Sequence, residues 1–336
     1  MERKILHVDV NSAFLSWTAV EMLKNGAGVD IRTIPAIIGG DEEKRKGIVL
    51  AKSVPAKAYG IKTADPIYFA KQKCPNLQIY PSNFKIYRKY SNAMFQILQQ
   101  YTNQIERFSI DECFLDITNF IPKEKTDIQI AYEINKRIKE ELGFTVNIGV
   151  APNKLLAKMA SDFTKPDKVH TLYTSEIPTK MWILPVSELF MVGKKSLPKL
   201  ERIGIKTIGD LAHRKQEDMA KMFGKFGKLV WEFANGIDET PVNSQKEEPK
   251  CIGNSATLPQ DLTNLEKIEE VLLALTEQTT YRLRKHNLLA STVGVQLRTK
   301  EFKNYSHQKT LLTPTDSTKI IYEMAKAILQ ELYKGD

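Results

Sequence analysis

An acidic pair inside an apolar stretch restricts the fold of this chain more than any other feature of its sequence. Asp111 and Glu112 stand between the apolar runs 105–110 and 113–117. Neighbouring residues of a regular strand point to opposite faces, so both side chains can reach one target only at a hairpin bend. Burial of two carboxylates is also costly unless a cation compensates their charge. The pair therefore predicts a bend at a sheet edge, open to solvent or to a cation.

A third carboxylate, Asp9, ends the first predicted strand. Residues 5–10 alternate between apolar and polar side chains, which places Asp9 and His7 together on one face. Three carboxylates that meet at a sheet edge form a hard-oxygen site suited to Mg²⁺, and two ions about 4 Å apart would support an in-line phosphoryl displacement. The residues alone leave another interpretation open, in which Asp111 and Glu112 are solvated turn residues and Asp9 is an acid at a helix N-terminus.

The spacing of apolar residues predicts a chain of mixed α and β elements. In the first half we expect strands at 33–38, 47–51, 105–117 and 144–150, and helices at 14–23, 87–101, 126–142 and 154–163. From Pro185 onward, short helices separated by glycines are expected. After a linker at 239–249, the pattern predicts strands at 252–258, 292–298 and 307–312 and helices at 265–285 and 318–333.

Composition narrows the class of protein. The chain is 42% hydrophobic and 26% charged, which is typical of a globular protein and excludes a disordered or collagen-like one. No apolar run is long enough to cross a bilayer, and Asp9 interrupts the stretch that a secretory signal would need, so we expect a cytoplasmic protein. The net charge of +9 is compatible with a polyanionic partner. Three distant cysteines support neither a disulfide framework nor a zinc site.

Five stretches together resemble the Y-family translesion DNA polymerases of the DNA polymerase IV group, in the family's order and spacing: 5–14, 55–63, 109–117, 153–162 with Lys165-Pro166, and 226–228. The resemblance covers essentially the whole chain. It implies an α+β fold, a multidomain right-hand polymerase with a C-terminal α+β unit. The expected domains are a palm (1–12 and 79–170), fingers (13–78), a helical thumb (171–238), a linker (239–249) and a little finger (250–336) that lacks its last strand.

The resemblance also implies the site and the reaction. The catalytic metal ligands for two Mg²⁺ ions would be Asp9, Asp111, Glu112 and the main-chain carbonyl of Val10. The nucleotide would lie against Ala13, Phe14, Lys57 and Lys165. Phe14 would be the steric gate, a ring beneath the incoming sugar that excludes a 2′-hydroxyl; the alternative is a ring on the apolar face of the first helix. The implied reaction adds dNTPs to a primer 3′-hydroxyl, with low fidelity because no segment remains for a proofreading exonuclease.

Two regions are candidates for duplex binding. Residues 189–205 resemble a helix-hairpin-helix, in which the backbone N–H groups at Gly193 and Lys194 would face a phosphate. Arg298 and Lys300 alternate with valines and would lie on the solvent face of a strand, where they could follow the phosphate backbone. The expected partners are primer-template DNA and an incoming dNTP, with no membrane and a monomeric state. Binding to a sliding clamp stays open, because no tail motif is visible before Asp336.

Some residues depart from the family pattern. Lys57 and Val54 stand where arginine and tyrosine are usual, so the grip on the triphosphate is expected to differ. Ile48 and Leu50 form a bulkier roof over the templating pair than in several relatives, which should narrow tolerance for large adducts in lesion-bypass assays. Asn11 replaces a common aspartate, which leaves the metal site intact if that position contributes only backbone.

Two other functions remain to be weighed. The turn 39–43 looks like the signature of diguanylate cyclases, although that fold would not account for residues 170–336. A DNA-binding protein without activity could share the architecture, but the intact acidic residues argue against it. Primer extension with Mg²⁺ separates the three, because a cyclase would make a cyclic dinucleotide from GTP and a binding module would make no product.

Overall fold

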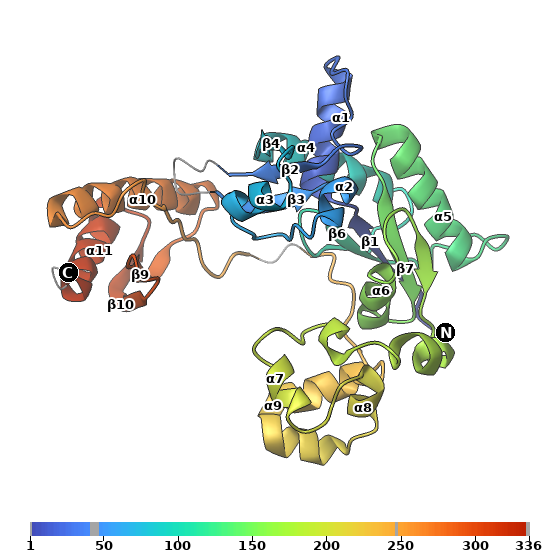
Figure 1. Cartoon of the computed structure of the whole chain (residues 1–336). Helices are drawn as coiled ribbons and strands as arrows, with labels where there is room; N and C mark the ends of the chain where they lie inside the picture. The colour runs from blue at the N-terminus through green and yellow to red at the C-terminus, as the bar shows by residue number, and fades with distance from the viewer. Residues whose placement is uncertain (1, 41–46, 246–247, 334–336) are drawn as a thin grey trace. The chain divides into compact units, whose positions relative to one another are not determined.

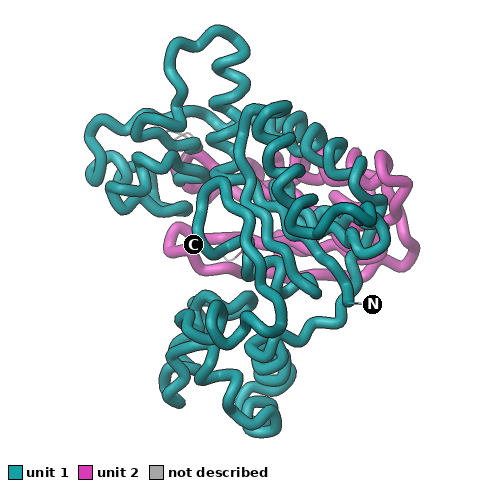
Figure 2. The backbone as a smooth tube through the Cα atoms, turned by 90° about the vertical axis from the view of Figure 1, so that its right-hand side faces the viewer, with its two compact units in different colours: residues 1–40, 48–246 teal, residues 41–47, 247–336 magenta. Residues whose placement is uncertain are grey.

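The computed structural model describes residues 2–40, 47–245 and 248–333, which fall into two units that we treat separately (Figure 2). The described part of the first unit comprises residues 2–40 and 48–245, and that of the second is mainly residues 248–333. No helix in the described ranges is long and apolar enough to cross a membrane.

A five-stranded sheet is the centre of the first unit. Its order is β5-β6-β1-β7-β8, and the strands are β5 (Ile105–Arg107), β6 (Glu112–Asp116), β1 (Ile5–Val10), β7 (Val146–Ala151) and β8 (Val169–Thr171). The central strand β1 runs antiparallel to both neighbours and is buried along its whole length. The alternation of residues 5–10 therefore correctly predicted a strand with two distinct faces. The structure shows that both faces are buried.

Helices cover both faces of this sheet (Figure 1). One face packs against α1 (Ala13–Lys24), α4 (Phe84–Leu98) and α5 (Asp127–Arg137), which the π-helical turn η1 (Ile138–Leu142) extends. The other face packs against α6 (Lys154–Ser161). The capping residues Asn83, Thr126 and Asn153 begin α4, α5 and α6, each by accepting a hydrogen bond from a backbone N–H in the first turn.

A second, smaller sheet with two helices lies between α1 and α4 in the sequence. Its three strands have the order β3-β2-β4, with β2 (Ala36–Gly39), β3 (Val49–Lys52) and β4 (Gln78–Pro81), and it carries α2 (Val54–Ala58) and α3 (Ile67–Lys73). A separate apolar core fills the space between this sheet and its helices. Sequence spacing predicted β2 and β3 to within three residues but missed β4, α2 and α3, because such short elements carry little periodic signal.

Short helices follow the central sheet from residue 174 to residue 234. They are η2 (Thr174–Glu176), η3 (Ile177–Met181), η4 (Val186–Glu188), α7 (Leu197–Glu201), α8 (Ile208–Ala212) and α9 (Gln216–Ala234). Their apolar core is continuous with the face of α6 that points away from the sheet. The glycine-rich texture of this stretch predicted this arrangement, and α9 changes direction at Gly224, where φ is 62°.

The described residues of the second unit form two strands and two helices: α10 (Leu265–Lys285), β9 (Ala290–Arg298), β10 (Asn304–Thr315) and α11 (Thr318–Leu332). Strands β9 and β10 pair antiparallel, and Val293 and Val295 face the helices. The strand predicted at 252–258 was wrong. That segment lies along α10 instead, where Arg282 Nη2 donates to the carbonyl oxygen of Gly253 at 2.6 Å. Its residues between Ile252 and Leu258 are small or polar and exposed, so no apolar face holds them against a sheet.

Several element bounds differ from the predicted ones for local reasons. The predicted strand 105–117 divides at the bend into β5 and β6, as the acidic pair required. The helix expected at 87–101 begins at Phe84 and ends at Leu98. The turn 39–43, on which the cyclase comparison rested, falls largely on residues 41–46, outside the described residues, as do Lys246 and Glu247 of the linker and the end of the chain at Asp336.

We expect Gly149→Ala to lower the free energy of unfolding by roughly 3 kcal/mol, because a Cβ there would lie 1.9 Å from the carbonyl oxygen of Ala157. That contact is where α6 rests on β7. Denaturant unfolding of the variant measures the loss. Gly28→Ala is the matched control, since nothing lies within 4 Å of its Cβ position. Equal stability of the two variants would contradict the close approach of α6 to the sheet.

Candidate active site

Two of the three predicted carboxylates meet across neighbouring strands. Asp9 of β1 lies directly opposite Glu112 of β6 in the strand register. Directly opposed residues of an antiparallel pair point to the same face, which here is the face that α6 covers. Asp9 is only 8% exposed, and the side chain of Glu112 is 17% exposed. The sheet therefore brings two acidic side chains together at a position that is largely excluded from solvent.

Asp111 joins this pair through its main chain. It stands in the bend before β6, and its carbonyl oxygen accepts a hydrogen bond from the N–H of Val10 at 3.1 Å. Its carboxylate Oδ1 accepts a hydrogen bond from Ser109 Oγ at 2.6 Å. The bend thus brings residue 111 beside the end of β1, while its side chain turns to a neighbour within the bend. Asp111 is half-buried.

Two lysines supply the positive charge of the site. Lys158 on α6 donates to Glu112 Oε1, and Lys165, four residues after the helix, donates to Asp9 Oδ2. Asp162 links the two lysines, with its carboxylate 3.3 Å from Lys158 Nζ and 2.8 Å from Lys165 Nζ. The result is a continuous network of three carboxylates and two ammonium groups.

Electrostatics show that this network is short of positive charge. The pKa of Asp9 is raised to about 6, chiefly by burial and also by the charge of Glu112, and the two lysines only partly oppose the effect. Burial works against the charged form of Lys158 and of Lys165, but their acidic neighbours outweigh it and the pKa of both rises. The site therefore favours added cations.

The donor set fits a hard divalent metal. Carboxylate oxygens and a main-chain carbonyl are the ligands that Mg²⁺ prefers. Within the described residues no three His, Cys, Asp or Glu side chains are already gathered as a ready-made metal cluster. Asp111 points to Ser109 and the other two carboxylates hold lysines. Metal binding would therefore need an exchange of partners among side chains that are already in place.

A buried histidine lies behind the carboxylates. The ring of His7 packs against Phe114 with centroids 4.5 Å apart, and its Nδ1 is 2.7 Å from Ser161 Oγ. Its Nε2 has no hydrogen-bond partner and lies 3.9 Å from Glu112 Oε1. Burial lowers the pKa of His7 well below its ordinary value, and the charge of Lys158 lowers it further. His7 is therefore a neutral group in the floor of the site.

Asn11 holds the segment that carries Lys165. Its Oδ1 accepts the backbone N–H of Asp167 at 2.9 Å, and its Nδ2 donates to Asn147 Oδ1 at 3.1 Å. The position where relatives have aspartate thus has a structural role in this chain.

Phe14 lies in a cluster of aromatic rings beside Ala13, the first residue of α1. Its ring stacks on that of Tyr87 with centroids 4.4 Å apart and planes at 11°, and Phe84 meets it edge-on at 5.8 Å. Ala13 is buried, whereas Phe14 is half-buried and keeps part of its ring open. The cluster holds the ring in one orientation, as a steric gate would require.

Lys57 lies on α2, in the small sheet layer, and is exposed. Its neighbour Lys52 is partly buried and donates from Nζ to Thr63 Oγ1 at 3.0 Å. Burial lowers the pKa of Lys52, and the charge of Lys57 lowers it further. The two like charges are therefore close enough to repel each other.

The predicted duplex-binding residues differ in how well the structure matches the expectation. Met191, in the segment that resembles a helix-hairpin-helix, has a positive φ of 72°, a conformation that glycine adopts more readily than methionine. The N–H of Gly193 donates to Ser196 Oγ at 3.0 Å, so it is already engaged, while Lys194 is exposed. A phosphate there would have to replace an internal hydrogen bond.

In the second unit, Arg298 is exposed at the end of β9 and donates from Nε to Asn304 Oδ1 at 2.9 Å. Lys300 does not lie on the strand, because β9 ends at Arg298 and Lys300 belongs to the turn that leads to β10. Its Nζ is 3.8 Å from Glu301. The prediction that both residues lie on the solvent face of a strand was therefore correct for Arg298 and wrong for Lys300, because the strand ends at Arg298.

Sequence reasoning assigned no role to Lys158, Asp162 or His7. A usable signal was present for the first two, because residues four apart on a helix share a face and Lys158 follows Leu155, Leu156 and Ala157, which are buried. A lysine at that spacing on the covered side of a helix must find an acidic partner. For His7 the alternation of β1 indicated the correct face, but the identity of its neighbours depended on α6.

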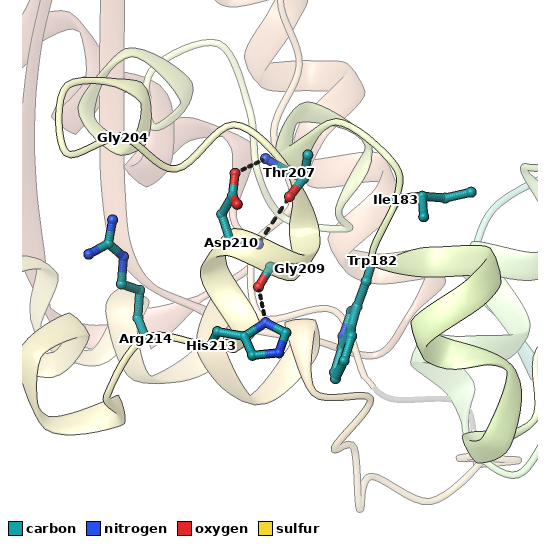
Figure 3. A pocket seen from close by; sticks show the side chains of 8 residues that line it. All are labelled: Trp182, Ile183, Gly204, Thr207, Gly209, Asp210, His213 and Arg214. Carbon is teal, nitrogen blue, oxygen red and sulfur yellow. Dashed lines mark hydrogen bonds between the residues drawn. The ribbon is translucent and has the colours of Figure 1, made fainter.

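A hollow of about 500 Å³ lies elsewhere in the first unit, between the segment 182–183 and α8 (Figure 3). Trp182, Asp210, His213 and Arg214 are among the residues that line it. His213 Nδ1 is 2.7 Å from the carbonyl oxygen of Gly209, and Asp210 caps α8 with Thr207. None of its lining residues belongs to the carboxylate network, so we do not assign the reaction to this hollow.

Comparison with known proteins gives consistent results. Residues 8–162 match the impB/mucB/samB family, and residues 249–336 match the impB/mucB/samB family C-terminal domain. The chain is 51% identical over 333 residues to DNA polymerase IV of Clostridium acetobutylicum, covering 99% of this chain and 84% of that protein. It is 38% identical to DNA polymerase IV 1 of Bacillus subtilis, covering 96% of this chain and 77% of that protein.

Among solved structures, a Y-family DNA polymerase chimera of Dbh and Dpo4 superposes with a TM-score of 0.86 at 25% identity, covering 98% of this chain and 93% of the other. A ternary complex of Dbh, with substrates partially disordered, gives a TM-score of 0.68, also at 25% identity, and covers 99% of this chain and 95% of the other.

The raised pKa of Asp9 predicts a pH dependence of stability. Because the folded state binds this proton more tightly than the unfolded state, the stabilisation is complete below the ordinary value of 3.8 and is lost as pH rises through about 6. In metal-free buffer, the unfolding free energy of the wild type relative to Asp9→Asn should fall by about 3 kcal/mol over that range. Denaturant titrations of both proteins measure this, and parallel pH profiles would contradict the assignment.

Proposed function

This chain belongs to the impB/mucB/samB family of Y-family translesion DNA polymerases, and on that premise we propose how its residues carry out the reaction. It is a DNA-directed DNA polymerase of the translesion type, with the low fidelity and the metal-dependent phosphoryl transfer that are general to the family. It acts on DNA and deoxynucleotides and requires a divalent metal.

One observation carries the assignment of the site. Asp9 and Glu112 face each other across β1 and β6, and the pair favours added positive charge although two lysines contact it. We propose that these two carboxylates, with Asp111 and the main-chain carbonyl of Val10, hold two Mg²⁺ ions. Bound Mg²⁺ would supply charge neutralisation for the triphosphate and acidify the primer 3′-hydroxyl.

The lysines have a second role in this proposal. When the carboxylates take up metal, Lys158 keeps Asp162 as its partner, 3.3 Å away. Lys165 also retains Asp162, but it lies on a partly exposed segment and is free to turn from Asp9 to a triphosphate. Asn11 holds that segment in position through the N–H of Asp167. Lys165 thus serves as counter-ion in the empty state and as triphosphate ligand in the loaded state.

Residues of the fingers segment, on α1 and α2, make the remaining nucleotide contacts in this proposal. Phe14 acts as the steric gate, because Tyr87 and Phe84 hold its ring and leave part of it open. The backbone at Ala13 and the exposed ammonium of Lys57 bind the triphosphate. Lys57 offers a point charge where arginine would form two parallel hydrogen bonds, so its contribution is smaller than that of the usual residue.

The proposed domains are those expected from the sequence: palm (1–12 and 79–170), fingers (13–78), thumb (171–238) and little finger (250–336). Gly193 and Lys194 in the thumb, and Arg298 and Lys300 in the little finger, contact the phosphate backbone of the duplex. Such contacts carry no base information, which suits an enzyme that must accept any sequence. The enzyme works in the cytoplasm as a monomer, and recruitment by a sliding clamp is compatible with this role.

We expect Asp111→Ala to reduce nucleotide incorporation by at least about a thousandfold, because a metal ligand is lost, while primer-template binding changes little. Primer extension with Mg²⁺ and a DNA-binding titration measure the two effects. Glu140→Ala, which removes an exposed acid in η1, should keep full activity. Extension by the Asp111 variant at the wild-type rate would overturn the metal-site assignment, and absence of extension by the wild type would favour a binding protein without activity.

We expect Phe14→Ala to raise ribonucleotide incorporation relative to deoxynucleotide incorporation by about tenfold or more, because the ring no longer meets the 2′-hydroxyl. The ratio of kcat/KM values for the two nucleotides measures it. Phe84→Ala is the matched control, since it removes a ring from the same cluster but leaves the gate itself. An equal change in both variants would show that packing of the cluster, and not Phe14 itself, sets the discrimination.

A further inference from the structure

The start of α3 lies directly beside Ile48 and Leu50, the two residues that the resemblance to Y-family polymerases places over the templating pair. Pro66 forms a β-bridge with Ile48, and Val49 exchanges two backbone hydrogen bonds with this segment, donating to Asp65 at 2.9 Å and accepting from Ala64 at 2.8 Å. Helix α3 begins at the next residue, Ile67 (Figure 1). Its first turn is therefore anchored to Ile48 and to the strand β3 that follows it and carries Leu50.

This first turn presents two aromatic rings to solvent. Tyr68 is 62% exposed and Phe69 is 52% exposed, whereas Ile67 and Ala70 of the same helix are fully buried. The two rings are 5.5 Å apart at 66°, so they support each other and leave ring faces open. They do not belong to the apolar core of this layer. A pair of large exposed rings at a defined place is typical of a binding surface.

The segment that carries the pair is basic. Residues 47–81 contain five lysines (Lys52, Lys57, Lys62, Lys71 and Lys73) and one acidic residue, Asp65, which gives a net charge of +4. Asp65 is paired with Lys73 at 2.8 Å. Lys62 and Lys57 are exposed. Aromatic rings within a basic surface are the combination that binds single-stranded nucleic acid, because bases stack on the rings and phosphates meet the lysines.

We propose that Tyr68 and Phe69 form a stacking platform for the unpaired template strand immediately ahead of the templating base. This inference rests on the proposed function, because the resemblance to Y-family polymerases is what places Ile48 and Leu50 over the templating pair. The occupant is single-stranded, since a duplex hides the faces of its bases, and the charge of +4 complements a polyanion. The platform holds the unread template bases in a stack and so orders their delivery to the site.

The test compares two primer-template DNAs that differ in the unpaired template strand. One has a single templating nucleotide, and the other has roughly eight further unpaired nucleotides, which is within the usual site size. Fluorescence anisotropy without dNTP measures the affinity of each DNA. The wild type should bind the longer overhang more tightly, and the Tyr68→Ala/Phe69→Ala variant should lose about fivefold or more of that increment, because each stacked base contributes at least that factor.

Three controls separate stacking from other effects. The Tyr68→Phe/Phe69→Trp variant keeps both rings and should retain the increment. Tyr132→Ala removes a ring that is 58% exposed on α5 and should also retain it. Thermal unfolding should be unchanged in the double alanine variant, because both rings are more than half exposed. If the double alanine variant kept the full gain in affinity from the longer overhang, or if Tyr132→Ala lost as much of it, the stacking platform would be overturned. A full gain in the double alanine variant would instead favour a protein partner for Tyr68 and Phe69.

Failure of this inference can be distinguished from failure of the proposed function. Extension on the DNA with a single templating nucleotide needs no platform, so the double alanine variant should extend it at the wild-type rate. Failure of the wild type to extend that DNA would count against the polymerase assignment, whereas loss of overhang binding alone concerns only Tyr68 and Phe69.

Discussion

The charge balance between Asp9, Glu112 and the two lysines governs the active region of this protein. Carboxylates that are this deeply buried are unfavourable without compensation, and the lysines supply it only in part. The residual deficit of positive charge makes the site receptive to divalent cations. Asp162 contacts both Lys158 and Lys165, so each lysine would keep an acidic partner if Glu112 and Asp9 bound metal instead.

This balance depends on close packing between helix and sheet. Gly149 lets α6 rest on β7 without an intervening side chain, and Lys158 reaches Glu112 only from that position. The opposite face of the sheet is a large apolar core that holds β1 in register. Away from this centre, the small sheet layer has two lysines that repel each other, Lys52 and Lys57, and an exposed pair of aromatic rings, Tyr68 and Phe69.

Much of the fold could be predicted from local patterns. The alternation of residues 5–10 predicted a two-faced strand, and the acidic pair predicted the bend between β5 and β6. Longer helices were found because periodicity accumulates over several turns. Local patterns failed where the partner decided the conformation. The segment 252–258 has few apolar residues and follows α10 instead of forming a strand, and the short helices α2 and α3 depend on the core beneath them.

The sequence by itself determined which residue types the candidate site contains and that Asp9 and His7 share a face of β1, because strand alternation is a local property. Only the tertiary structure decided what surrounds them. Lys158 and Lys165 reach Glu112 and Asp9 across more than forty intervening residues, and Asp111 turns its carboxylate to Ser109. Such pairings depend on how helix and sheet dock, and docking is set by packing between segments that are distant along the chain.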